Sequence, residues 1–215
     1  MIRTDNLARE RANIYRWFAC LLFQELSVTD IASLNSPELQ QLLRGLKSIP
    51  ELHLPADLFR RKLKALANRP NNQLELAADY AELFLMAPPS GVSPYAGHYP
   101  HSSPAEERIL MDQWLNRLKQ QTSNNEAADH LAVQLAVMAL LIESLDDLSP
   151  SFTSQRQYLN ERLLSWLPSL VKLCQQRDKF GFYSSLLRLL KSYILQDEQY
   201  LTECIHTSSS SIQTP

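Results

Sequence analysis

Glycine is scarce in this sequence, with 4 glycines against 12 prolines in 215 residues. Few glycines leave few of the tight turns that β-hairpins need, whereas a proline that follows serine or leucine suits the first turn of a helix. The sequence also lacks a run of alternating apolar and polar residues rich in β-branched side chains, which a strand would need. These absences predict an all-α fold.

Cysteine, net charge and long apolar runs are limited as well. The three cysteines are odd in number and widely spaced, which fits a reducing compartment and gives no metal-ligand spacing. A formal net charge of −2 offers no basic face for nucleic acid. The N-terminus has no hydrophobic secretory segment, and the longest apolar run, 135–142, is far shorter than the roughly 20 residues of a membrane span. We therefore expect a cytoplasmic protein without nucleic-acid binding or stable membrane insertion.

Motifs of common enzyme sites are also missing. The sequence contains no G-x-x-x-x-G-K-[ST] loop, no G-x-G-x-x-G turn and no H-E-x-x-H helix. His98-x-x-His101 could ligate a metal, but no cysteine or carboxylate in the same loop offers a third ligand. We expect no enzymatic activity, no metal and no cofactor. A nucleotide- or metal-dependent enzyme on a helical bundle, using His98, His101 or His130, remains the alternative.

Apolar residues with helical spacing predict a bundle of about ten helices. Ser36-Pro37 and Ser103-Pro104 each read as an N-cap followed by proline, and Glu106 completes a capping box. The segment 50–55 is expected to be a loop, and the proline-rich segment 88–103 a longer one. In the helix predicted over 72–87, Leu74 and Leu85 belong to the apolar stripe.

A polar stretch, Gln120–Leu131, separates two long helical patterns. It predicts an N-terminal half over 1–120, a hinge over 121–129, a C-terminal half over 130–203 and a disordered tail over 204–215. Two helical halves joined by a polar connector can exchange between chains, so the protein is expected to be a monomer or a domain-swapped dimer that crosses within 120–129.

An acidic residue stands next to a histidine at the end of this stretch. Asp129 is expected to cap the following helix, with His130 as a surface residue. The alternative is that Glu126, Asp129 and His130 together receive a cationic segment.

Four segments of the sequence match motifs of one known protein family. Asp79–Leu85 (DYAELFL) resembles its Y-x-x-L-F helix, and Ser93–Tyr99 (SPYAGHY) resembles its S-P-Y-A-S-x-Y loop. Glu126–Leu131 (EAADHL) resembles its E-P-x-D-H-L signature. Trp166–Pro168 and Phe180–Tyr183 resemble the last-helix region of one branch. The family is that of the TorD/DmsD-type chaperones, which mature molybdoenzymes exported by the twin-arginine pathway, and the resemblance is strongest to the TorD branch, chaperones of trimethylamine N-oxide reductase.

The resemblance implies an all-helical cytoplasmic chaperone with no reaction of its own. Such a protein binds the twin-arginine leader and the apo form of its enzyme, assists insertion of the molybdenum cofactor and delays export. Weak binding of GTP is also implied, with no residue marking its site. The implied residues for binding the leader peptide are Leu83, Phe84, Pro94, Tyr95, Asp129 and His130, with Tyr80 and Glu126 as weaker candidates.

The sequence departs from the family pattern at two positions. Ala127 stands where the family has proline, which predicts a looser hinge, and Gly97 stands in place of serine, which is expected to be a mild change.

Overall fold

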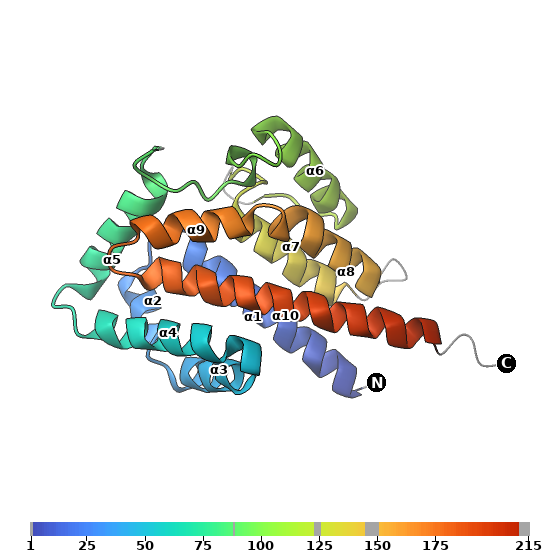
Figure 1. Ribbon diagram of the computed structural model, residues 1–215, viewed down its shortest axis with the longest axis horizontal. Helices are drawn as coiled ribbons and strands as arrows, with labels where there is room; N and C mark the ends of the chain where they lie inside the picture. The colour runs from blue at the N-terminus through green and yellow to red at the C-terminus, as the bar shows by residue number, and fades with distance from the viewer. Residues whose placement is uncertain (1, 88, 123–125, 145–150, 211–215) are drawn as a thin grey trace. The chain divides into compact units, whose positions relative to one another are not determined.

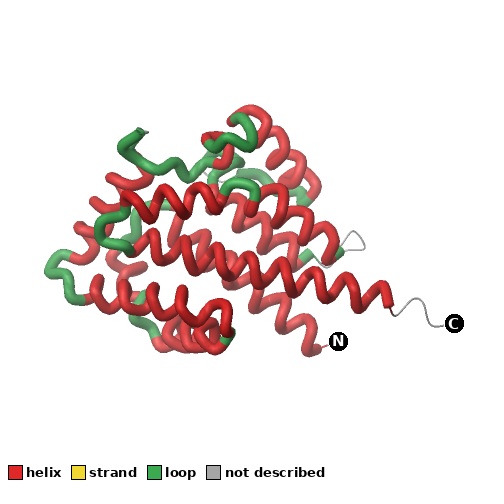
Figure 2. Tube along the Cα trace, in the orientation of Figure 1, coloured by secondary structure: helices red, strands yellow, loops and turns green. Residues whose placement is uncertain are grey.

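The computed structural model describes residues 2–87, 89–122, 126–144 and 151–210 of the chain. These residues form helices and loops and no strand (Figures 1 and 2), which confirms the predicted all-α fold. None of the described helices combines the length and the apolar character needed to span a membrane. The α-helices are α1 (Ile2–Phe23), α2 (Val28–Ser33), α3 (Pro37–Ser48), α4 (Pro50–Ala67), α5 (Asn72–Tyr80), α6 (Pro104–Arg117), α7 (Leu131–Glu143), α8 (Phe152–Tyr158), α9 (Leu167–Arg177) and α10 (Phe182–Ser210).

Three shorter helical segments complete the fold. Ala81–Leu85 continues α5 and Leu159–Leu164 continues α8 as π-helix, while Ala96–His98 forms a turn of 3-10 helix. The capping predictions made for α3 and α6 are confirmed. Ser36 accepts a hydrogen bond from the backbone N–H of Leu39, and Ser103 forms a capping box with Glu106.

The chain divides into two compact units, each made of discontinuous segments. The first unit is formed from the ranges 1–23, 95–167 and 194–215, and the second from 24–94 and 168–193. The predicted halves, 1–120 and 130–203, are continuous in sequence, so they cut across these units. Exchange of halves between two chains stays a prediction. Residues 123–125 of the expected hinge lie outside the described residues.

The first unit is centred on α7, which packs along α1. Leu135 and Met138 of α7 are fully buried, as expected for a helix that is apolar on nearly every side. The same unit buries an ion pair in which the guanidinium of Arg11 donates to both carboxylate oxygens of Asp197, at 2.7 and 3.0 Å. The hydroxyl of Tyr15 donates to the same carboxylate at 2.9 Å. These contacts join α1 to α10 within the unit.

The second unit includes α3 and α4, which lie side by side (Figure 1). Pro50 begins α4, so the prediction of a loop over 50–55 is wrong. A proline at the first helical position costs no backbone hydrogen bond, because the N–H of any other residue at this position would have no acceptor inside the helix. Pro55 lies inside α4, and the burial of Leu52 and Phe59 on one face shows that core packing outweighs the proline's poor helix propensity.

The C-terminal helix is longer than the sequence pattern predicted. Helix α10 continues through Ser210, so the expectation of disorder from residue 204 is wrong for 204–210, while 211–215 lie outside the described residues. Side-chain to backbone hydrogen bonds support this last part, since the hydroxyls of Thr207 and Ser208 donate to carbonyls four residues earlier.

Candidate functional site

In the first unit, the loop that precedes α6 lies against the segment that precedes α7. Tyr95 and His130 form an isolated antiparallel β-bridge. The backbone N–H of Ala96 donates to the carbonyl of Asp129 at 3.0 Å. These contacts hold together two segments that are more than thirty residues apart in sequence. Their side chains form one polar cluster, which comprises Tyr95, Glu126, Asp129 and His130.

Asp129 is the buried acid of this cluster. Its side chain is fully buried, and its carboxylate accepts from the backbone N–H of Gly97 and from Nε of Arg108, each at 3.3 Å. A buried carboxylate needs such donors, because leaving it without them in an apolar environment is costly. Asp129 does not cap α7, so the prediction that it is the N-cap is wrong.

His130 caps α7 instead. The backbone N–H of Ala132 donates to Nδ1 of His130 at 3.1 Å, so the proton of the neutral ring is assigned to Nε2. The side chain is buried rather than on the surface, and its ring lies edge-on to Tyr95 and Phe23, with centroids 5.1 and 5.9 Å apart. Burial lowers the pKa of His130, although the nearby carboxylates of Glu126 and Asp129 act to raise it. A neutral ring is the form that can accept the capping hydrogen bond.

Glu126 stands at the half-buried side of the cluster. Its Oε1 accepts from the hydroxyl of Tyr95 and from the backbone N–H of Ala127, both at 3.0 Å. Burial, followed by the hydrogen bond to Glu126, raises the pKa of Tyr95 to about 12. The phenol therefore stays protonated and donates. A proline at position 127 could not donate to Glu126, so alanine allows one contact here that the family's usual residue excludes.

Gly97 lies where the loop passes the start of α6. A Cβ atom added at Gly97 would lie 2.4 Å from Cα of Pro104 and 2.6 Å from its nitrogen. Both atoms belong to the backbone and cannot rotate away. The expectation that glycine for serine is a mild change is therefore wrong for this backbone, because a serine side chain has no room.

The other aromatic and histidine residues of the loop make contacts within the unit. Tyr99 is buried against Trp166, with ring centroids 5.2 Å apart, and so attaches the loop to the core. Nε2 of His101 lies 3.2 Å from Oε1 of the buried Glu107, whose carboxylate also accepts from Arg162. His98 is exposed and approaches the ring of Tyr95. Among the described residues there is no group of three histidine, cysteine, aspartate or glutamate side chains that could hold a metal ion.

The second unit holds an aromatic cluster around Tyr80. The rings of Tyr80, Phe84 and Tyr183 contact one another with centroids 5.1 to 5.5 Å apart, and all three side chains are buried. Leu74 and Leu85, which were predicted on the apolar stripe of this helix, are 68% and 65% exposed. Leu85 belongs to the π-helical continuation of α5, where the wider turn changes which residues face the core.

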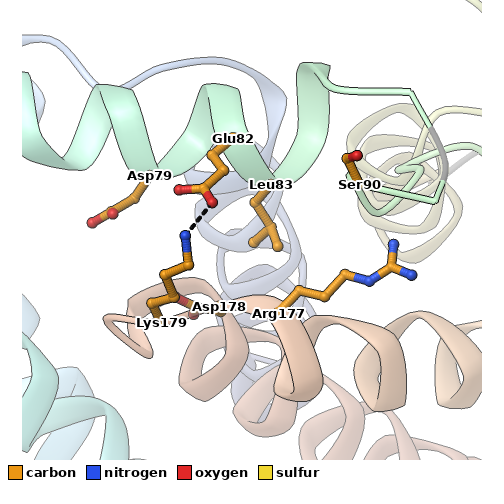
Figure 3. A pocket seen from close by; sticks show the side chains of 7 residues that line it. All are labelled: Asp79, Glu82, Leu83, Ser90, Arg177, Asp178 and Lys179. Atoms are coloured by element: carbon orange, nitrogen blue, oxygen red, sulfur yellow. Dashed lines mark hydrogen bonds and ion pairs between the residues drawn. The ribbon is translucent and has the colours of Figure 1, made fainter.

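A small pocket lies beside this cluster (Figure 3). It is lined by Asp79, Glu82, Leu83, Ser90, Arg177, Asp178 and Lys179. Figure 3 shows Glu82 and Lys179 pointing toward each other, joined by an ion pair, while Arg177 extends from the end of α9 toward the loop that carries Ser90. Arg177 also donates to the carbonyl of Gly91. Four of the charged residues of the pocket thus have partners, since Asp79 also pairs with Arg69, and Leu83 is the apolar residue among those that line it.

The structure therefore places the eight predicted binding residues in two sets of four. The set in the first unit forms the polar cluster and comprises Tyr95, Glu126, Asp129 and His130. The set in the second unit is buried and comprises Tyr80, Leu83, Phe84 and Pro94.

Comparison with known proteins gives this arrangement a family. The model of the family described as nitrate reductase delta subunit matches residues 49–172, more than half of the chain. The chaperone protein TorD of Salmonella bongori is 42% identical over 197 residues, covering 92% of this chain and 92% of that protein. The TorD chaperones of Photobacterium profundum and Vibrio cholerae are each 37% identical and cover 89% and 92% of this chain, and 94% of their own length. The chain belongs to the TorD chaperone family.

One residue in contact with the polar cluster was missed by the sequence interpretation. Arg108 lies on α6, 21 residues before the aspartate that it contacts, and none of the four family-like segments includes it. The helix that carries Arg108 was predicted from the capping box at Ser103. Whether Arg108 faces Asp129, however, depends on how the loop before α6 packs against the segment before α7. Only a contact map, not local spacing, could have revealed it.

Proposed function

We propose that this protein is a cytoplasmic chaperone that binds the twin-arginine leader and the apo form of a molybdoenzyme, namely trimethylamine N-oxide reductase. In this role it assists insertion of the molybdenum cofactor and delays export. It has no reaction of its own. The observation that carries the proposal is membership of the TorD family over 92% of the chain, together with relatives that are named chaperones.

The chemistry of the polar cluster supports the same proposal. A twin-arginine leader presents two guanidinium groups followed by an apolar stretch. A receptor for it needs carboxylates for the guanidinium groups and apolar surface for the stretch. Asp129 and Glu126 supply two carboxylates in one cluster of the first unit. Leu83 and Phe84, which the family resemblance also implies, belong to the second unit, where both are buried and Leu83 lines the pocket.

The alternative of an enzyme that uses histidine receives no support from the contacts. His130 accepts the capping hydrogen bond of α7, and His101 contacts the buried carboxylate of Glu107. Each of these contacts gives the ring a structural role that needs no substrate. GTP binding stays an expectation from the family resemblance.

The proposal is tested with the precursor of trimethylamine N-oxide reductase, produced in cells that cannot make molybdenum cofactor. The purified apo-precursor is mixed with this protein, and complexes are separated by size-exclusion chromatography. We expect a complex with the apo-precursor, less complex when the leader is removed, and less again with cofactor-loaded enzyme. If neither this precursor nor any other apo-molybdoenzyme forms a complex, the proposed function is wrong. The same columns report whether the free protein is a monomer or a dimer.

A further inference from the structure

Arg108 covers the one fully buried carboxylate of the polar cluster. Its Nε lies 3.3 Å from Oδ1 of Asp129, and Asp129 is 0% exposed while the side chain of Arg108 is 53% exposed. A cation from the solvent can reach this carboxylate only where a side chain moves aside. Arg108 is able to do so, because half of its surface is already in water and its helix would not need to shift.

The attachment of Arg108 is weak by its geometry. It uses one nitrogen at the long end of the hydrogen-bond range, and its two Nη atoms make no hydrogen bond to the residues that the structure describes. A guanidinium that binds a carboxylate well makes two parallel bonds at about 2.7–2.9 Å. A half-exposed pair of the kind seen here shifts an equilibrium by only about twofold to fivefold.

Glu126 has spare capacity for a second cation next to this pair. Both of its donors, the hydroxyl of Tyr95 and the backbone N–H of Ala127, bind to Oε1. Oε2 accepts no hydrogen bond from the described residues. The cluster therefore holds one carboxylate with a loosely bound internal arginine and one whose Oε2 receives no hydrogen bond from the part of the chain that the structure describes.

We propose that Arg108 is an internal competitor for the leader's arginine: it occupies Asp129 in the free protein and is displaced when the leader binds. This inference rests on the proposed function. An internal competitor reduces the fraction of molecules in which Asp129 is accessible. The apparent affinity of any cationic ligand for this site equals its intrinsic affinity multiplied by that fraction. Removing Arg108 therefore strengthens binding of a twin-arginine leader and of a twin-lysine version by the same factor.

The test is calorimetry with a synthetic twin-arginine leader and the full chain. Arg108→Gln is expected to bind the leader about twofold to fivefold more tightly than the natural protein. The matched control is Arg117→Gln, which removes the same charge from the same helix but contacts Trp114, and should bind as the natural protein does. This control separates release of Asp129 from a general loss of positive charge.

A double-mutant cycle with Asp129→Asn makes the test specific. Asp129→Asn keeps an oxygen for the N–H of Gly97 but removes the charge, so adding Arg108→Gln to it should give no gain in affinity. The inference is overturned if the natural protein binds the leader and Arg108→Gln binds it equally or more weakly. If Arg108→Gln folds poorly by circular dichroism, Arg108→Ala and the twin-lysine leader provide the same comparison, and a gain that differs between the two leaders refutes competition. If the natural protein binds no leader at all, the proposed function fails together with the inference.

Discussion

Replacement of His130 should separate its capping role from its packing role. In His130→Asn the side-chain oxygen can still accept from the backbone N–H of Ala132, because asparagine is a good N-cap. What is lost is the ring, which contacts Tyr95 and Phe23, and aromatic pairs of this kind contribute about 0.5–1.5 kcal/mol each. We expect the free energy of unfolding to fall by about 1–3 kcal/mol. His130→Ala also loses the cap, which adds about 1 kcal/mol.

The pH dependence of stability gives a second measure of the same residue. Because burial lowers the pKa of His130, folding favours the neutral ring. Its contribution to stability is therefore fully present above the ordinary value of 6.5 and falls as the pH drops below 6.5 toward the lowered value of the folded state. The natural protein should lose stability over this window, and His130→Asn should lack this part of the loss.

The assay is urea unfolding followed by circular dichroism, at about pH 7.5 and about pH 5.5. Equal losses of stability between these pH values in the natural protein and in His130→Asn would show that the ring is not held neutral by the fold. If His130→Ala is no less stable than His130→Asn, the histidine does not act as a cap.

Two further substitutions test the packing of the first unit. Gly97→Ala should destabilise the protein by about 1–3 kcal/mol in thermal unfolding, because the new Cβ would lie 2.4 Å from Cα of Pro104. The control is Gly45→Ala, at an exposed helix position with nothing within 4 Å, which should instead stabilise the protein by about 0.5–1 kcal/mol. Similar effects of the two substitutions would contradict the close contact between Gly97 and Pro104. Asp197→Ala should cost about 3–5 kcal/mol in urea unfolding, because it leaves the buried guanidinium of Arg11 without its carboxylate. A loss of stability below about 1 kcal/mol, which is the size expected for the more exposed ion pair that Glu198 forms, would show that the buried ion pair of Asp197 contributes little.

Local signals in the sequence predicted the helices better than the faces that they bury. The caps at Ser36 and Ser103 depend only on neighbouring backbone groups, so spacing was enough to find them. The start of α4 at Pro50 was missed because residues 50–55, with a proline at each end, were assigned to a loop, whereas packing of the apolar residues of α4 tolerates Pro55 inside the helix. The exposure of Leu85 was missed because a π-helical segment breaks the spacing of 3.6 residues per turn.

The family resemblance predicted which residues belong to the candidate site, but not which contacts these residues make. Asp129 was predicted to cap α7 and His130 to lie on the surface, whereas His130 caps α7 and the buried Asp129 accepts hydrogen bonds from Gly97 and Arg108. Adjacent residues on a chain can take either role, and the choice depends on which of them the distant loop reaches. That information is in the long-range contact between Tyr95 and His130, which no short motif contains.

The most direct measurement of the central claim is calorimetry of leader binding to the natural protein and to Asp129→Asn. We expect the natural protein to bind a twin-arginine leader, and the variant to keep its helical circular dichroism while binding about 10- to 100-fold more weakly, as for loss of a hydrogen bond to a charged group. Absence of binding heat with every twin-arginine leader, or equal affinity of the two proteins, would contradict the account.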